Sequence, residues 1–158
     1  DKKDAWVLER GKKHGIPFIT FSPKEFQSKN AYEEAIKERL AEYAIDLVVL
    51  AGYMRIVGET LLQAYPNKII NLHPSLLPSF PGLHGIQEAY EYGVKVTGIT
   101  IHYIDAGVDT GPIIAQATTE VLPADTLEAL EEKIHRLEHY WYPKVLAKKK
   151  KKGASITC

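Results

Sequence analysis

The most informative stretch of the chain is Lys68-Ile69-Ile70-Asn71-Leu72-His73-Pro74. Residues 68–72 have the length and apolar character of a buried strand, and Pro74 ends it because proline lacks the N–H that a central strand requires. Asn71 and His73 are two residues apart, so in an extended chain both side chains point to the same side. Open α/β sheets bind ligands at the carboxyl ends of their strands. This polar pair therefore predicts a functional site at the end of the strand.

Further strands and helices alternate along the chain on both sides of this stretch. Strands are expected over residues 18–21, 47–51, 96–104 and 113–121, which are short runs rich in β-branched or apolar side chains. Helices are expected after the capping patterns Ser22–Glu25 and Asn30–Glu33, over residues 58–65 and 84–92, and after a cap formed by Asp125 and Glu128. This alternation predicts an α/β fold with a mainly parallel sheet.

The last expected helix carries the clearest apolar stripe. Its members recur at helical spacing and are Leu127, Leu130, Ile134, Leu137, Trp141 and Val145. Such a stripe is typical of a helix that packs along the sheet, and we expect truncation of Leu137 to lower stability.

The composition is that of one globular domain. The chain has 158 residues, of which 45% are hydrophobic and 25% charged, and twenty basic side chains balance twenty acidic ones. A net charge of zero argues against recruitment of nucleic acid or of a membrane surface. The apolar runs are too short to span a membrane, and no signal peptide is expected. Because Cys158 is the only cysteine, we expect a reduced, cytoplasmic setting.

A second polar position lies on a glycine-punctuated turn. Asp109 stands between two expected strands, where a carboxylate can favour the protonated form of a nearby imidazole. An imidazolium beside an amide donor suits the stabilisation of an oxyanion, so Asn71, His73 and Asp109 are candidate catalytic residues. Simpler interpretations remain open, namely a loop histidine bonded to the backbone and an Asx turn at Asp109. A metal site formed by His73, His102 and Asp109 is a further alternative.

Four motifs in this order resemble the formyltransferase family that uses 10-formyltetrahydrofolate. They are Asn71-Leu72-His73-Pro74-Ser75-Leu76-Leu77-Pro78 with Pro81-Gly82-Leu83-His84, Ala51-Gly52-Tyr53-Met54-Arg55-Ile56, Gly98-Ile99-Thr100-Ile101-His102-Tyr103, and Val108-Asp109-Thr110-Gly111-Pro112-Ile113. The resemblance implies a Rossmann-like formyltransferase fold with helices on both faces of the sheet. It also implies direct acyl transfer, without a covalent enzyme intermediate and without a metal.

The resemblance assigns roles to individual residues. Asn71 and protonated His73, with Asp109 behind it, match the catalytic set. Folate contacts are implied for Lys29, Met54, Arg55, Ile56, Val57, Asp105, Ala106, Gly107 and Val108. Acceptor contacts are implied for Gly52, Pro74, His135, Arg136, Leu137 and Glu138. The Leu77-Pro78 bond matches a cis-proline position.

Within the family, the chain is most similar to members that formylate glycinamide ribonucleotide in purine biosynthesis. The alternatives are relatives that act on methionyl-tRNA or that hydrolyse formyltetrahydrofolate, and a folate-binding module without turnover. A neutral chain without a basic extension disfavours the tRNA enzyme, and Pro81–His84 favours the ribonucleotide over water. The expected partners are therefore two small molecules, and a homodimer is compatible with the sequence.

The resemblance runs from about Asp4 to about Pro143. Family members begin with a strand and a turn that cradles the acceptor's phosphate, and this chain matches the segment after that unit. We therefore expect a formyltransferase domain over residues 1–147, N-terminally truncated relative to the family. Residues 148–158 form a lysine-rich tail, whose five consecutive lysines are expected to be a solvated, frayed helix end.

Overall fold

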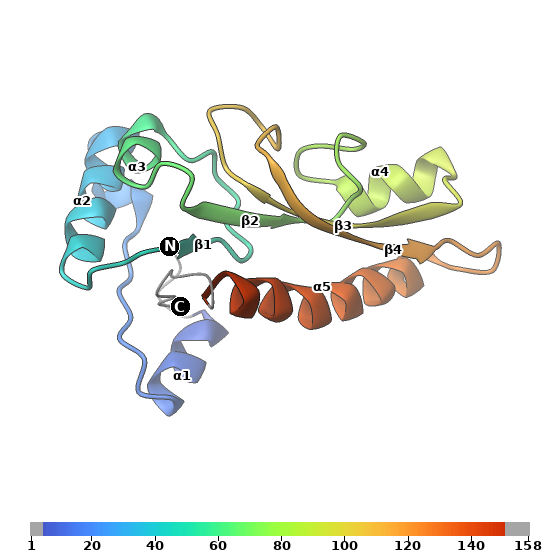
Figure 1. Ribbon diagram of the computed structural model, residues 1–158, viewed down its shortest axis with the longest axis horizontal. Helices are drawn as coiled ribbons and strands as arrows, with labels where there is room; N and C mark the ends of the chain where they lie inside the picture. The colour runs from blue at the N-terminus through green and yellow to red at the C-terminus, as the bar shows by residue number, and fades with distance from the viewer. Residues whose placement is uncertain (1–4, 151–158) are drawn as a thin grey trace.

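The computed structural model describes residues 5–150, and Figure 1 shows a sheet with helices on either side of it. The order of elements is α1 (Trp6–Lys13), the 3-10 turn η1 (Pro23–Glu25), α2 (Lys29–Ala41), β1 (Val48–Val49), α3 (Glu59–Ala64), β2 (Ile69–His73), α4 (Gly85–Tyr92), β3 (Val96–Tyr103), β4 (Ile113–Glu120) and α5 (Leu127–Lys150). The predicted α/β class is confirmed.

The sheet is mixed and has the strand order β1-β2-β3-β4. Strand β1 pairs parallel with β2, whereas β3 is antiparallel to both β2 and β4. Three strands therefore run in one direction and β3 runs against them, so most strands are parallel in direction, as predicted. The pairing departs from a parallel pattern because β3 and β4 follow each other through a short connection, which joins antiparallel strands readily.

Helices cover both faces of the sheet, as predicted. Side chains of β2 alternate between the faces. Ile70 belongs to the cluster that packs under α5 with Ile101 and Val145, and Ile69 belongs to the cluster with α3 on the other side. Asn71 and His73 have the parity of Ile69 and so lie on the face opposite α5. In Figure 1, α5 runs along one side of the sheet while α4 lies on the other.

Three local expectations are wrong. Residues 18–21 form no strand, because no strand among the described residues lies beside them. Helix α2 is capped by Ser28, whose hydroxyl accepts the N–H of Ala31 at 3.1 Å, and not by Asn30. Helix α5 is likewise capped by Thr126, which accepts the N–H of Ala129, while Asp125 binds Lys133.

The stripe on α5 forms the centre of a hydrophobic cluster. Leu130 and Ile134 are fully buried with Ile99 and Ala117 of the sheet, and Leu137 is only partly buried against them. The stripe is thus confirmed as core, but its deepest members lie one and two turns before Leu137.

Helix α5 continues to Lys150, and Lys149 donates to the hydroxyl of Tyr103 at 2.7 Å. The rest of the lysine-rich tail, residues 151–158, lies outside the described residues.

We expect Ile134→Ala to lower the free energy of unfolding by about 2–5 kcal/mol, because it leaves a cavity in a fully packed site. Leu137→Ala should cost less, since that side chain keeps contact with solvent. Urea titration of both variants measures the difference. A loss for Leu137→Ala as large as that for Ile134→Ala would contradict the packing described.

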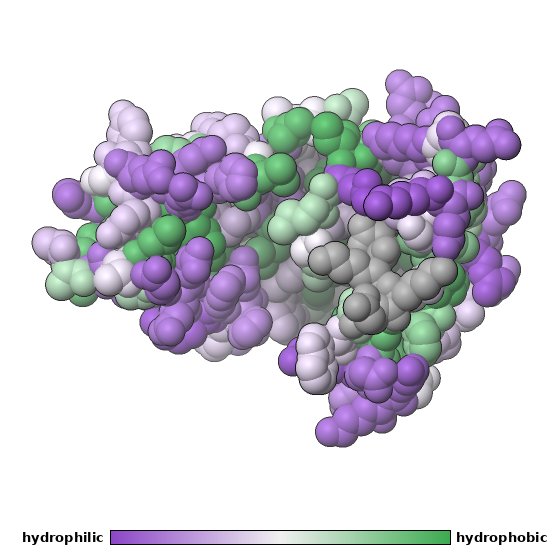
Figure 2. Space-filling view, turned by 180° about the vertical axis from the view of Figure 1, so that it is seen from behind, coloured by the Kyte–Doolittle hydropathy of each residue, from purple (hydrophilic) through white to green (hydrophobic). Residues whose placement is uncertain are grey.

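Hydrophobic side chains also remain at the surface. Figure 2 shows hydrophobic patches between hydrophilic side chains on the face seen from behind. Large exposed hydrophobic residues include Trp6, Val7, Met54 and Ile56. No helix within residues 5–150 has the length and hydropathy needed to cross a membrane.

Candidate active site

The register between β2 and β3 brings the polar side chains of the two strands together. Asn71 lies opposite His102, and His73 lies opposite Thr100. The Asn71 amide Nδ2 is 3.4 Å from His102 Nε2. A shift of either strand by one residue would turn that strand's side chains to the other face of the sheet, so the pairing itself assembles the site.

Asp109 completes the cluster from the loop between β3 and β4. Its Oδ2 lies 3.4 Å from His73 Nδ1, and its Oδ1 lies 3.6 Å from His102 Nε2. Asp109 has a positive φ of 55°, a conformation that aspartate tolerates better than most residues, and its carboxylate accepts the N–H of Gly82 at 2.8 Å. The three predicted catalytic groups therefore converge from two strands and one loop.

The His73 ring is held by a backbone carbonyl. His73 Nε2 is 2.8 Å from the carbonyl oxygen of Phe80. Because a carbonyl can only accept, Nε2 carries a proton and donates it to this oxygen. The other nitrogen, Nδ1, faces Asp109, so a proton there would be attracted by the carboxylate. His73 is 3% exposed, so its ring is held almost entirely among protein groups.

The loop after His73 is fastened to β3 through Thr100. The Thr100 hydroxyl donates to the carbonyl of Ser75 at 2.7 Å and accepts the N–H of Leu77 at 3.0 Å. The Leu77-Pro78 peptide bond is cis, as the resemblance implied. Gly85 at the start of α4 packs so closely that an added Cβ would lie 3.2 Å from His73 Nε2.

His102 is fully buried beneath the cluster. Its Nδ1 is 2.9 Å from the carbonyl oxygen of Tyr103, so Nδ1 carries the proton. Nε2 of the neutral ring is then an acceptor, and Asn71 turns its amide nitrogen toward it. Burial lowers the pKa of His102 below its ordinary value of 6.5, although the Tyr103 carbonyl and Asp109 oppose this shift. The sequence suggested a strand histidine beside the site or, as the alternative, a metal ligand, and did not predict the contact with Asn71.

This burial predicts a pH dependence of stability. The unfolded chain protonates His102 near pH 6.5, while the folded chain resists protonation, so the unfolded state binds more protons below that pH. The contribution to stability is present above about pH 6.5 and declines as the pH falls. Urea unfolding at pH 8 and at pH 5.5 measures it. The variant His102→Gln, which cannot titrate, should lose less stability over this interval; an equal loss would contradict the assignment.

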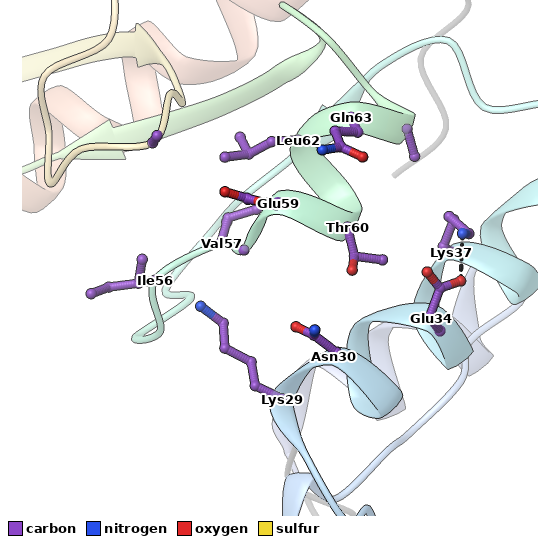
Figure 3. A pocket seen from close by; sticks show the side chains of 13 residues that line it. Lys29, Asn30, Glu34, Lys37, Ile56, Val57, Glu59, Thr60, Leu62 and Gln63 are labelled. Carbon is purple, nitrogen blue, oxygen red and sulfur yellow. Dashed lines mark ion pairs between the residues drawn. The ribbon is translucent and has the colours of Figure 1, made fainter.

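A cavity of about 620 Å³ lies between α2, α3 and the loop before α3. Figure 3 shows Lys29 extending from α2 toward Ile56 and Val57, with Asn30 and Thr60 facing each other across the space. An ion pair joins Glu34 and Lys37 at the rim. Of the residues predicted to contact folate, the cavity brings together Lys29, Ile56, Val57 and Ala106.

The other predicted folate residues lie in the two segments that reach this cavity. Met54 and Arg55 precede Ile56 and are exposed. Asp105 shapes the second segment, because its carboxylate accepts the N–H of Gly107 and the hydroxyl of Thr110. That loop also carries Asp109, so it connects the cavity with the catalytic cluster.

The predicted acceptor residues are more dispersed. Gly52 follows β1 with a positive φ of 66°, and Pro74 follows His73 directly. His135, Arg136, Leu137 and Glu138 lie on α5, which covers the opposite face of the sheet. Within the described residues, no hydrogen bond or ion pair joins these four to the catalytic cluster. Burial raises the pKa of Glu138, and His135 and His139 oppose the shift.

The metal alternative finds no geometric support. No group of three or more histidine, cysteine or acidic residues in the described part of the chain is arranged to hold a metal ion.

The profile of the family described as "Formyl transferase" matches residues 1–146. The chain belongs to the formyltransferase family.

Two formyltransferases that are similar to this chain are named for the same activity. The phosphoribosylglycinamide formyltransferase of Bacillus subtilis (strain 168) is 55% identical over 146 residues, which cover 92% of this chain and 75% of the relative. The crystal structure of the enzyme of that name from Bacillus halodurans has a TM-score of 0.91 and 56% identity, and the match covers 94% of this chain and 76% of that one.

The match to a longer relative is local. The trifunctional purine biosynthetic protein adenosine-3 of Drosophila melanogaster is 41% identical over 147 residues, 93% of this chain but only 11% of the relative.

Proposed function

We propose that this formyltransferase moves the formyl group of 10-formyltetrahydrofolate to the amine of glycinamide ribonucleotide, a step of purine biosynthesis. The observation that carries the proposal is the convergence of Asn71, His73 and Asp109 within 3.4–3.6 Å contacts linked through His102. It occurs in a chain 55% identical to a phosphoribosylglycinamide formyltransferase.

The reaction forms one C–N bond and breaks another. The acceptor amine attacks the formyl carbon, and the carbonyl oxygen becomes an oxyanion. The second N–H of the Asn71 amide is a donor to this charge, and a positive charge on the nearby His73 ring stabilises it electrostatically. The attacking nitrogen then loses a proton, N10 of the folate gains one, and the C–N10 bond breaks to release tetrahydrofolate and the formylated amide.

The donors are preorganised by neighbours that do not react. His102 accepts one N–H of the Asn71 amide, which fixes the amide's orientation, and the Phe80 carbonyl fixes the plane of the His73 ring. Asp109 supplies a negative charge beside Nδ1, which attracts positive charge that develops on the ring during the reaction. The proton leaving the amine can pass to N10 through this cluster without a covalent enzyme intermediate.

The cavity beside α2 suits the folate donor. Ile56 and Val57 offer apolar surface, and the ammonium of Lys29 offers a positive charge to the carboxylates of the folate's glutamate. The loop containing Ala106 links this cavity with Asp109. The acceptor lies, in this proposal, near Gly52 and Pro74.

Steady-state turnover with 10-formyltetrahydrofolate tests the proposal. We expect turnover with glycinamide ribonucleotide as acceptor, and none above background with methionyl-tRNA or with water. Preference for either of those acceptors would replace the proposed activity by that of a different formyltransferase. Folate affinity without any turnover would instead indicate a binding module.

The proposal includes three further properties of the protein. They are a cytoplasmic location, assembly as a homodimer, and a formyltransferase domain that ends near residue 147.

A further inference from the structure

A buried carboxylate on α2 has no part in the chemistry described so far. Glu33 is 1% exposed, whereas the neighbouring Glu34 is exposed and pairs with Lys37. Glu33 Oε1 accepts the N–H of Gly58 at 2.7 Å. Glu33 Oε2 is buried and has no hydrogen-bond partner among residues 5–150.

This arrangement is unfavourable for stability alone. A buried carboxylate oxygen without a hydrogen bond loses its hydration without compensation. An apolar side chain could fill the same space on the apolar face of α2, where Ile36 and Leu40 pack against the cluster of Val57 and Leu61. The contact made by Oε1 therefore needs another explanation.

That contact joins the two walls of the cavity. Gly58 directly follows Ile56 and Val57, which line the cavity from the loop, and Lys29 lines it from α2. Lys29 Nζ lies 3.9 Å from Glu33 Oε1. Figure 3 shows the Lys29 side chain and the segment of Ile56 and Val57 on opposite sides of the same space. A single carboxylate thus contacts the loop and lies beside the cation across from it.

We propose that Glu33 is a positioning residue for the formyl donor, and that it acts by holding the 54–58 loop at a fixed distance from α2 through its hydrogen bond to Gly58. The inference rests on the proposed function, because it takes this cavity as the folate site. Glu33 itself is buried and does not contact the ligand.

The glycine at position 58 fits this role. A Cβ at Gly58 would lie 2.6 Å from Glu33 Oε2 and 2.8 Å from Oε1, so alanine there must displace the carboxylate. The backbone at Gly58 has φ −91° and ψ 176°, which any residue adopts. The penalty for alanine at this position therefore arises from Glu33 and not from the backbone.

The test compares Glu33→Ala, Glu33→Gln, Gly58→Ala and the double variant Glu33→Ala/Gly58→Ala. For each we measure kcat, KM for 10-formyltetrahydrofolate and KM for glycinamide ribonucleotide. Calorimetry with 5-formyltetrahydrofolate, which carries no formyl group on N10, reports donor-site affinity without turnover. Thermal melting shows that each variant is folded. Glu42→Gln is the matched control, because Glu42 is an exposed acid at the end of α2 that pairs with Arg39 and does not line the cavity.

Glu33→Ala and Gly58→Ala should each raise the KM for the donor by about 10-fold, the scale of one hydrogen bond to a charged group. The acceptor KM and kcat should stay near the parental values. Glu33→Gln should restore donor binding, because its amide oxygen still accepts from Gly58. In the double variant the effect of Gly58→Ala should vanish, since the group that it displaces is gone.

Other results overturn the inference. Equal changes in the two KM values, no rescue by Glu33→Gln, or an undiminished effect of Gly58→Ala in the double variant would each do so. If the parental chain turns over and binds 5-formyltetrahydrofolate while these variants behave like Glu42→Gln, only the inference fails. If the parental chain neither turns over nor binds the folate, the proposed function fails as well.

Discussion

Replacing His73 by alanine should lower kcat by about 100-fold or more while the chain still folds. The imidazole is the group that would carry positive charge next to the forming oxyanion, and it is held for that purpose by Asp109 and by the Phe80 carbonyl. Thr100 still fastens the following loop to β3 when the ring is removed. Turnover with glycinamide ribonucleotide, together with a circular dichroism melting curve, measures both parts of the expectation.

His14→Ala is the matched control for this variant, since His14 is an exposed histidine at the end of α1. It should keep the parental kcat. Near-parental turnover of His73→Ala would remove His73 from the chemistry and leave it as a buried loop histidine.

Asp109→Asn should also lower kcat by about 100-fold or more, for an electrostatic reason. The asparagine oxygen can keep the hydrogen bond from Gly82, so the loop should keep its shape. The negative charge beside His73 Nδ1 is lost, and with it the attraction for the imidazolium proton. Single-turnover rates over a range of pH measure the effect.

The double variant His73→Ala/Asp109→Asn provides the contrast. Because Asp109 acts through His73, removing both should cost little more than removing His73 alone. A double loss equal to the product of the two single losses would show that the carboxylate acts independently of the imidazole.

Much of this site could be predicted from residue pattern, because the pattern reflects physical constraints that act locally. The apolar run before Asn71, the two-residue spacing to His73 and the prolines after it predict a strand that ends in a rigid loop. Helix α5 was equally predictable, since its stripe reports one buried face. These features depend on neighbours in sequence.

The remaining features depend on partners distant in sequence. No local signal places Asn71 opposite His102, because the register of β2 and β3 is a property of the whole sheet. The carbonyl of Phe80, which sets the His73 ring, carries no side-chain signal at all. A strand at residues 18–21 was predicted from its composition, but a strand also requires a neighbour.

Glu33 is an intermediate case. Its spacing of three from Ile36 and seven from Leu40 places it on the buried face of α2, and that spacing was available in the sequence. A helix-cap role was the simpler interpretation, because Asn30 precedes it by three residues. Ser28 caps the helix instead, which leaves the carboxylate free to bind Gly58.

Two hydrophobic clusters lie between the sheet and α5, one around Ile70 and the other around Leu130. Leu72 of β2 and Trp141 of α5 pack against both of these clusters. Helix α5 therefore cannot detach from one cluster without disturbing the other, and the strand that carries the catalytic side chains shares that restraint. The backbone amides of α5 and β2 should accordingly lose their protection against hydrogen exchange together, in a single opening event. The rigidity of the reaction centre is in this sense a collective property, set by a helix on the far side of the sheet.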